Sequence, residues 1–347
     1  MASTNVTGWQ AKYLWVKETT FNTQKAAAAA AAGTPMLMPV TSDSMDWNWS
    51  VQQTKWAGQG RAQSAAAVYL TEIAPTGDLV LDVNHAIYPS FLQPHFAGGV
   101  FAVGTIQAGT GYSYRYHTGT AVNKQSSYSL WRVLATGAEA DVFTGCIPNQ
   151  ITFAGNTTEP LKMTCSILGA DGTYAANAAY GTALTHRTDS AYKPYVAFNG
   201  VVSVTNGASQ IMGTVKSWTI TSNNNASSQM ALDGARGITD FLFGEHEVTL
   251  SMVADLDTNE VAKALLFQET IGTAIITYYG SNATVYGGTL SPDLTFTAYF
   301  RANKVTTPYA GNAGPIEMTL DGVGVDPGVG YSLDILGTAL SGTLHNA

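Results

Sequence analysis

Charged residues are scarce in this sequence. They make up 12% of its 347 residues, about half of the roughly 25% that is usual for a soluble domain. Apolar residues reach 45%, so the chain can bury a core and does not have the composition of a disordered protein. A surface with so little charge is typical of one that other subunits cover. Composition therefore favours an assembling protein over a freely diffusing monomer.

Positive charge is scarcer than negative charge. The sequence has 16 Lys and Arg against 24 Asp and Glu, which gives a formal net charge of −8. Sequence-independent binding of nucleic acid requires clustered Lys and Arg, so we do not expect a surface that grips phosphates. A protein that lets DNA pass without holding it fits this balance.

Cysteine and long apolar runs are nearly absent. Two cysteines, Cys146 and Cys165, are too few to form a disulfide framework for a chain of this length. They are consistent with buried free thiols in an intracellular protein. Residues 1–17 alternate polar and aromatic side chains without the apolar stretch of a signal peptide, and no window reaches the ~18 apolar residues of a membrane span. We therefore expect a protein that is made in a cytoplasm and does not enter a membrane.

Residues for catalysis, metal binding or nucleotide binding form no recognisable set. The six histidines are dispersed, without the spacing of a zinc site. Gly-rich stretches at 104–111 and 322–324 lack the Lys-Ser/Thr ending of a phosphate loop, and no Gly-x-Ser-x-Gly nucleophile turn occurs. The oxygen-rich segment 255–260 lacks the glycine and distal glutamate of a calcium loop, and helix capping explains it more simply. The sequence predicts no enzyme activity, no metal and no cofactor.

Apolar residues alternate with a period of two along most of the chain. Leu79 and Leu81 share one face of a predicted strand and Asp82 lies on the other. The same pattern predicts half-buried strands at 79–83, 128–136, 149–153, 161–168, 215–221, 247–255, 294–301 and 316–320. Segments 84–96 and 257–266 have helical spacing instead, although Pro89 and Pro94 limit the first. The predicted fold class is mainly β with two short helices.

Short motifs recur about 155 residues apart. Ala154-Gly-Asn156 and Pro160-Leu-Lys-Met-Thr164 return as Ala310-Gly-Asn312 and Pro315-Ile-Glu-Met-Thr319. Upstream, 45–51 is matched with 215–221, and each leads into a long polar loop, 52–64 or 223–237. The shared order indicates two homologous domains in tandem. The predicted organisation is an N-terminal arm and Ala-rich linker (1–35), a first domain (36–175), a linker (176–192), a second domain (193–340) and a C-terminal tail (341–347).

One aromatic cluster has two interpretations. Tyr112, Tyr114, Tyr116 and His117 alternate beside Arg115 on a predicted hairpin. Such spacing suits a platform on which a sugar stacks, and it suits a protein interface. We favour the interface.

Further segments occur in an order that resembles a known family. These segments are Lys17-Glu-Thr-Thr20, Pro39-Val-Thr-Ser-Asp-Ser44, Phe143-Thr-Gly-Cys-Ile-Pro-Asn149, Ser217-Trp-Thr-Ile-Thr-Ser-Asn-Asn224 and Arg236-Gly237. Together they resemble the tail tube proteins of long-tailed bacteriophages, in the form with two tube domains in one chain. The resemblance runs from about residue 15 to residue 336, and the order of the motifs carries it.

The resemblance implies two tandem β-sandwich tube domains, each with a short flanking helix. In such tubes six domains close each ring around a β-barrel lumen, so this chain is expected to form a trimer with pseudo-sixfold symmetry. Closing the sheets removes exposed strand edges, and stacked rings form the conduit for DNA ejection into the host. The implied partners are further copies of the chain, a tape measure protein in the lumen, tail terminator and tail tip proteins, and DNA in passage without specific binding. The implied location is the virion tail, after synthesis in the bacterial cytoplasm.

The resemblance also selects candidate residues. In this family the loop after the first strand reaches the next ring, which makes Arg61 and Arg236 in the two long loops the inter-ring candidates. Carboxylates in a lumen repel phosphates and keep DNA sliding. Asp82, Glu247 and Asp255, on the polar faces of predicted strands, are the lumen-lining candidates.

Other functions fit parts of the sequence. A capsid decoration or tail-end ring protein would share the low charge and the β-fold but would form no filament. A carbohydrate-binding β-sandwich adhesin would explain the aromatic residues but should carry an export signal. A β-rich hydrolase is disfavoured because no catalytic set is present.

Overall fold

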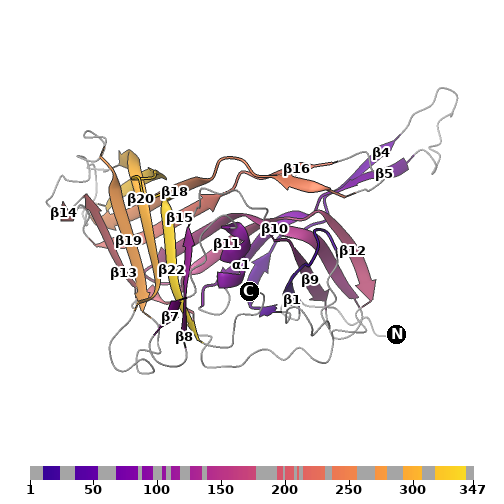
Figure 1. The fold of residues 1–347 in the computed structure, drawn as a ribbon, viewed down its shortest axis with the longest axis horizontal. Helices are drawn as coiled ribbons and strands as arrows, with labels where there is room; N and C mark the ends of the chain where they lie inside the picture. The colour runs from indigo at the N-terminus through magenta and orange to yellow at the C-terminus, as the bar shows by residue number, and fades with distance from the viewer. Residues whose placement is uncertain are drawn as a thin grey trace.

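The described part of the chain is antiparallel β-structure with one short helix (Figure 1), which confirms the mainly β prediction. The computed structural model describes residues 11–23, 36–53, 68–84, 88–96, 104–106, 111–117, 126–134, 139–176, 194–197, 200–206, 209–210, 214–230, 237–255, 270–279, 292–306 and 317–340. Its elements are β1 (Lys12–Lys17), β2 (Met36–Met38), β3 (Val40–Asp43), β4 (Trp49–Gln53), β5 (Val68–Ile73), β6 (Thr76–Asp82), α1 (Tyr88–His95), β7 (Gly104–Ile106), β8 (Gly111–His117), β9 (Tyr128–Leu134), β10 (Glu139–Asn156), β11 (Lys162–Leu168), β12 (Asp171–Ala176), β13 (Gly200–Asn206), β14 (Ser209–Gln210), β15 (Val215–Asn223), β16 (Ser227–Gln229), β17 (Asp240–Leu242), β18 (Glu247–Asp255), β19 (Gly272–Tyr279), β20 (Pro292–Thr306), β21 (Glu317–Gly324) and β22 (Leu333–Leu340).

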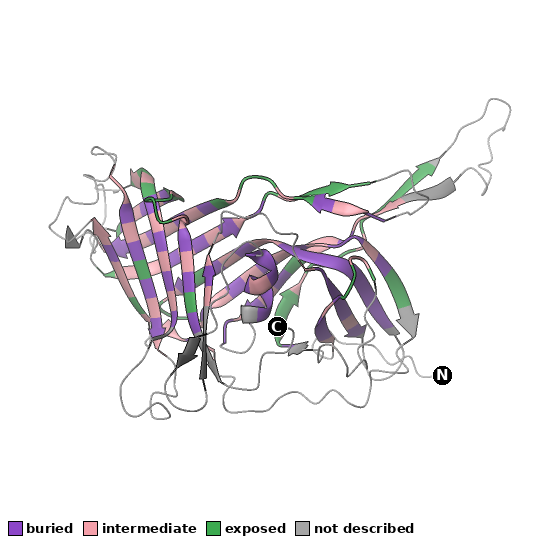
Figure 2. Ribbon diagram, viewed as in Figure 1, coloured by how far each residue is buried: buried purple, intermediate pink, exposed green. Residues whose placement is uncertain are grey.

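One continuous sheet runs through the whole molecule, and we call it the long sheet. Its strands are hydrogen-bonded in the order β3, β6, β11, the second half of β10, β15, β18, β21 and the second half of β20. Buried and less buried residues alternate along these strands (Figure 2). The long sheet therefore has one face on the core and one polar face, as the period-two pattern predicts.

Two smaller sheets branch from the long sheet. The first side sheet has the order β2, β1, β9, the first half of β10 and β12. The second side sheet has the order β14, β13, β19, the first half of β20, β22, β8 and β7. β10 and β20 are longer than predicted because each passes from a side sheet into the long sheet. Among the described strands the pairings form no closed circuit.

A single apolar cluster fills the space between the sheets. It extends from Trp15 on β1 to Ile335 on β22, and both are fully buried. Trp15 stacks on Phe91 of α1 and on Tyr128 of β9, with ring centroids 5.0 and 4.7 Å away. The predicted helix at 84–96 is thus confirmed as α1, where it fills the core beside β10. The second predicted helix, 257–266, lies outside the described residues.

The pairing pattern of the first half of the chain recurs in the second half. The order β3–β6–β11–β10 returns as β15–β18–β21–β20, and the hairpin β4–β5 has a counterpart in β16–β17. Register shifts recur as well, after Val40 and Val215 and after Pro148 and Ala302. These shifts align Val215 with Val40, so the sequence-based match of 215–221 with 45–51 is wrong by about five residues. The cause is that β3 is short and mostly exposed, which leaves it little apolar pattern.

The segment predicted as an N-terminal arm contains a core strand. β1 pairs with both β2 and β9. Just after it, the buried carboxylate of Glu18 accepts hydrogen bonds from Ser127 Oγ, Ser129 Oγ and the backbone N–H of Gly145, at 2.6, 2.8 and 2.9 Å. Gly145 has φ 63°, a conformation that glycine adopts at a β-bulge without strain. Glu18 thereby ties the end of β1 to the bend in β10.

Strands from the first predicted domain complete the second side sheet. β8 lies within 36–175 but pairs along its length with β22. Arg115 Nε donates to Asp334 Oδ1 at 2.9 Å, and the ring of His117 lies 4.8 Å from that of Tyr331. Tyr116 is buried. The described side chains of the aromatic cluster therefore contact β22 of the same chain.

Candidate conduit face and assembly edges

The three predicted lumen candidates lie on the polar face of the long sheet. Asp82 is on β6, and Glu247 and Asp255 are at opposite ends of β18. Each alternates with buried residues of its strand, such as Leu81 and Leu250. The structure thus brings them to one face without bringing them into one cluster, since β11, β10 and β15 separate β6 from β18.

More acidic residues share this face than the sequence analysis selected. They are Asp78 on β6 and Glu317 and Asp321 on β21. The alternation in the sequence could have identified them. Asp78 lies four residues from Asp82 and therefore on the same face of the strand, and Glu317 and Asp321 alternate with the buried Met318 and Leu320. Ser251 Oγ donates to Asp321 at 2.6 Å.

Most of the basic residues that the structure describes on this face lie beside carboxylates. Lys216 Nζ lies 2.7 Å from Asp255 and 2.8 Å from Glu317, and these bonds raise the pKa of the Lys216 ammonium. Lys162 pairs with Glu159 at 2.8 Å. Lys304 lies opposite Asp321 in the β20–β21 register. Because most of its basic groups have acidic neighbours, this face is a poor ligand for phosphates.

A row of threonines crosses the centre of the polar face. Thr164, Thr152, Thr221 and Thr249 are opposite one another on β11, β10, β15 and β18. The hydroxyls of Thr152 and Thr221 are 3.0 Å apart. The row presents small neutral groups without positive charge.

The pairing of β10 with β15 joins the two halves of the chain. Seven opposed pairs run from Gln150↔Asn223 to Asn156↔Ser217. Asn149, the extra residue of a bulge, closes the end of this joint: its carbonyl accepts from Asn224 N at 2.9 Å and its side-chain Oδ1 accepts from Ala226 N at 2.8 Å. We call β10, β15 and Asn149 the internal joint.

A buried histidine, His95, and a partly buried one, His246, lie beneath the internal joint. His95 Nε2 and His246 Nε2 contact Ser222 Oγ at 2.7 and 2.8 Å, and His95 Nδ1 lies 3.1 Å from Asn224 Nδ2. Burial lowers the pKa of His95 to about 3, with repulsion from His246 as a second cause. Burial also lowers the pKa of His246 to about 4. Both imidazoles are therefore neutral in the folded protein at pH 7.

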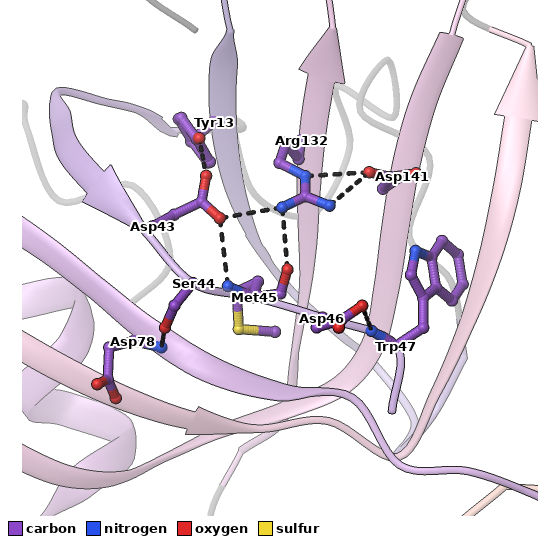
Figure 3. A network of polar contacts seen from close by, with 9 residues as sticks. All are labelled: Tyr13, Asp43, Ser44, Met45, Asp46, Trp47, Asp78, Arg132 and Asp141. Atoms are coloured by element: carbon purple, nitrogen blue, oxygen red, sulfur yellow. Dashed lines mark hydrogen bonds and ion pairs between the residues drawn. The ribbon is translucent and has the colours of Figure 1, made fainter. Parts of the chain in front are cut away.

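Each end of the long sheet is an edge among the described strands. β3 pairs with β6 alone, and residues 301–306 of β20 pair with β21 alone. Near β3, side chains cover the edge at Met45 (Figure 3). Met45 N donates to Asp43 Oδ1 at 3.2 Å, and Met45 O accepts from Arg132 Nη1 at 3.0 Å.

Arg132 is the centre of a polar network between β3 and the first side sheet (Figure 3). Its guanidinium lies 2.7 Å from Asp141 and 3.0 Å from Asp43, which also accepts a bond from the Tyr13 hydroxyl. Burial lowers the pKa of Arg132, but the two carboxylates outweigh it and the net pKa is raised. Burial and the bond to Asp43 raise the pKa of Tyr13.

The second half of the chain has apolar residues at the matching positions. Tyr13, Arg132 and Asp141 are opposite one another on β1, β9 and β10, as Val202, Ile276 and Phe296 are on β13, β19 and β20. Trp218 takes the place of Asp43 and packs 5.5 Å from Phe296. A polar network and an apolar cluster thus fill equivalent places, and replacement of buried ion pairs by apolar residues is often neutral or stabilising.

The inter-ring candidates Arg61 and Arg236 lie outside the described residues. The hairpins that lead to them are described, and β4–β5 projects far from the sheets (Figure 1). Trp49 and Val51 on β4 are 60% and 55% exposed, and Met230 and Leu242 on the second hairpin are 48% and 52% exposed. Exposed apolar residues on both hairpins make them candidate contact surfaces.

Comparison with known families decides the classification. The family model described as phage tail tube protein matches residues 8–278, well over half of the chain. The chain belongs to the phage tail tube protein family. No curated protein matches the chain.

Within the described ranges of this tail tube protein, no group of three or more His, Cys, Asp or Glu could hold a metal ion, and no helix has the length and apolarity to span a membrane.

The thiol prediction is confirmed in this tail tube protein. Cys146 and Cys165 are buried and free. Burial raises the pKa of both thiols, so neither is a reactive nucleophile.

We expect Arg132→Ala to destabilise the folded tail tube protein by about 3 kcal/mol, because it leaves Asp43 and Asp141 largely buried without their counter-charge. Lys162→Ala is the control, since its ion pair with Glu159 is exposed to solvent and contributes little to stability. Urea unfolding of both variants measures the difference. Equal losses would contradict a structural role for the network.

Stability should fall as the pH drops below about 6.5. Because the folded pKa values of His95 and His246 are lowered, the unfolded chain binds more protons in this range, which costs about 2 kcal/mol per histidine by pH 5. Urea midpoints between pH 8 and pH 5 test this. His95→Gln should flatten the profile, whereas His117→Gln, outside this cluster, should leave it unchanged; an unaltered profile in His95→Gln would refute the assignment.

Proposed function

We propose that this chain is the major tail tube subunit, which stacks as rings into the hollow conduit for DNA ejection. The observation that carries the proposal is the long sheet, with a polar, largely acidic face and an edge at each end. In this proposal three copies join edge to edge, and their polar faces together line the lumen.

The register of the long sheet supports closure into a barrel. Starting at Ser42, opposed residues lead through Val80, Thr164 and Thr152 to Thr221. Ser42 is equivalent to Ser217, since each follows a matching bulge. Crossing four strands therefore climbs four residues along β15. At about 3.3 Å per residue and about 4.8 Å between strands this gives a strand tilt of about 35°, as in closed barrels.

The repeated pairing order supports two tandem tube domains, which we assign to 36–175 and 193–340 with a linker at 176–192. β1 then belongs with the first domain, and β7 and β8 with the second side sheet. Three chains would supply six sets of four strands, and a barrel of that size at this tilt is about 45 Å across between backbones. A DNA duplex fits through such an opening.

The proposed mechanism of conduction is electrostatic. Asp82, Glu247 and Asp255 would face the lumen, and repulsion between carboxylates and phosphates keeps DNA from adhering. Lys162 and Lys216 are paired with carboxylates, so their positive charges are less available to bind phosphates. The proposed function needs no cofactor and no catalysis. The proposed partners are a tape measure protein, tail terminator and tail tip proteins, in a virion tail assembled in the bacterial cytoplasm.

We propose that the hairpins β4–β5 and β16–β17 contact the next ring through Arg61 and Arg236. An Arg61→Glu, Arg236→Glu double variant should form rings that stack poorly, because reversed charge opposes an acidic surface on the ring beneath. Electron microscopy of assembled tubes measures their length. Tubes of normal length from this variant would show that neither Arg61 nor Arg236 is needed for contact between rings.

The experiment that tests the ring joins two copies across their edges. If the joint between copies repeats the internal joint, Thr306 lies opposite Asp46 of the next copy, as Thr152 lies opposite Thr221. Cysteines at Thr306 and Asp46 should then oxidise to disulfide-linked dimers and trimers in assembled protein, because opposed residues in a sheet are within disulfide reach. Thr306→Cys with Ser44→Cys is the register control, since Ser44 lies two residues away, and it should cross-link less.

Electron microscopy of the same sample distinguishes the alternatives. Stacked hollow rings with the polar face inward agree with the proposal. A ring that never stacks would favour the tail-end or decoration protein, and a density map with Asp82, Glu247 and Asp255 on the outside would refute their lumen role.

A further inference from the structure

Asn149 performs a specific task in the internal joint. It is the extra residue of the bulge between Pro148 and Gln150, where the backbone of β10 turns away from β11. This position directs both its carbonyl and its side-chain Oδ1 at the backbone that follows β15, where they accept from Asn224 N and Ala226 N. A single asparagine thus extends the joint beyond the end of the strand pairing.

The second half of the chain has an asparagine at the matching bulge. Asn303 is the extra residue between Ala302 and Lys304 on β20. The flanking registers agree, since Ile151 lies opposite Cys165 on β11 and Val305 lies opposite Leu320 on β21. Asn303 is exposed, and its side chain has no hydrogen-bond partner within the described part of the chain. Its strand segment is the edge of the long sheet.

We propose that Asn303 binds a second copy of this chain, by accepting hydrogen bonds from backbone N–H groups of that copy's segment 49–51. This inference rests on the proposed ring and adds to it the residue that closes the joint. Because Val40 is equivalent to Val215, segment 49–51 is equivalent to 224–226 and stands where the partners of Asn149 stand in the internal joint.

The surroundings of Asn303 and of segment 49–51 suit this contact. Lys304, next to Asn303, would lie diagonally across from Asp46 of the other copy, so opposite charges meet at the edge. Trp49 and Val51, within the segment, are more than half exposed in the isolated chain. Apolar residues of this size at the end of an open sheet edge are expected to be covered on association.

A matched pair of variants tests the proposal. Asn303→Ala should leave the urea midpoint of the unassembled chain unchanged and raise the protein concentration needed for assembly about fivefold, as expected for one side-chain hydrogen bond lost at each joint. Asn149→Ala, in contrast, should lower the urea midpoint of the unassembled chain, because the bonds of Asn149 lie within one chain. Asn303→Asp should assemble better than Asn303→Ala, because the contact requires an acceptor and a carboxylate provides one.

Sedimentation over a concentration series and electron microscopy measure assembly of the full chain and of each variant. If Asn303→Ala assembles at the concentration of the unaltered chain, or if it destabilises the unassembled chain, the inference is overturned while the ring stands. If the unaltered chain forms no rings and the cysteine pair at Thr306 and Asp46 does not cross-link, the proposed function itself has failed.

Discussion

The antiparallel pairing of β10 with β15 is the interaction on which the rest of this structure depends. Without it the long sheet would be divided into two four-stranded sheets, each with two exposed edges, and edges of that length are prone to uncontrolled pairing. With it, the polar groups of β6 and β21 lie on one continuous face. The register of this pairing is also constrained. The bulge at Asn149 marks where the pairing ends, and the opposed threonines from Thr164 to Thr249 keep the strands in register.

The two halves solve the same packing problem with different chemistry. In the first half, Arg132 bridges Asp43 and Asp141 between β3 and the side sheet. In the second half, Trp218 and Phe296 fill the matching space. The polar solution lies beside the open edge at β3, where it also satisfies the backbone of Met45. The apolar solution lies beside the internal joint, where β10 already satisfies the backbone. Polar side chains thus lie where the strand edge is open, and apolar side chains lie where a neighbouring strand already pairs with the edge.

Much of the long sheet could be predicted from the sequence, because its strands bury one face and alternate accordingly. Met163 and Met318 show this, since both are buried on equivalent strands and both belong to the recurring motif. β1 could not be found in this way: Leu14 and Trp15 are adjacent and both fully buried, so the strand has apolar residues on both faces and no period of two. The Arg132 network had a local signal, a charge within an apolar run, but its partners come from three separate strands. The acidic residues on the polar face of the long sheet were identified in part, and Asn149 was missed because a bulge depends on the register of two strands and not on either alone.

The partnership of β8 with β22 has a consequence for how the molecule is made. Arg115 and Asp334, which bond across these strands, are 219 residues apart in the chain. At a translation rate of about 5–20 residues per second, β8 leaves the ribosome about 10–40 seconds before its partner. Contacts of such long range also fold slowly once both strands exist. The second side sheet is therefore the last part of the fold to be completed, and a nascent chain has no finished second half to offer to a neighbour. The connectivity thus delays completion of the second side sheet until the strand β22 has been synthesised.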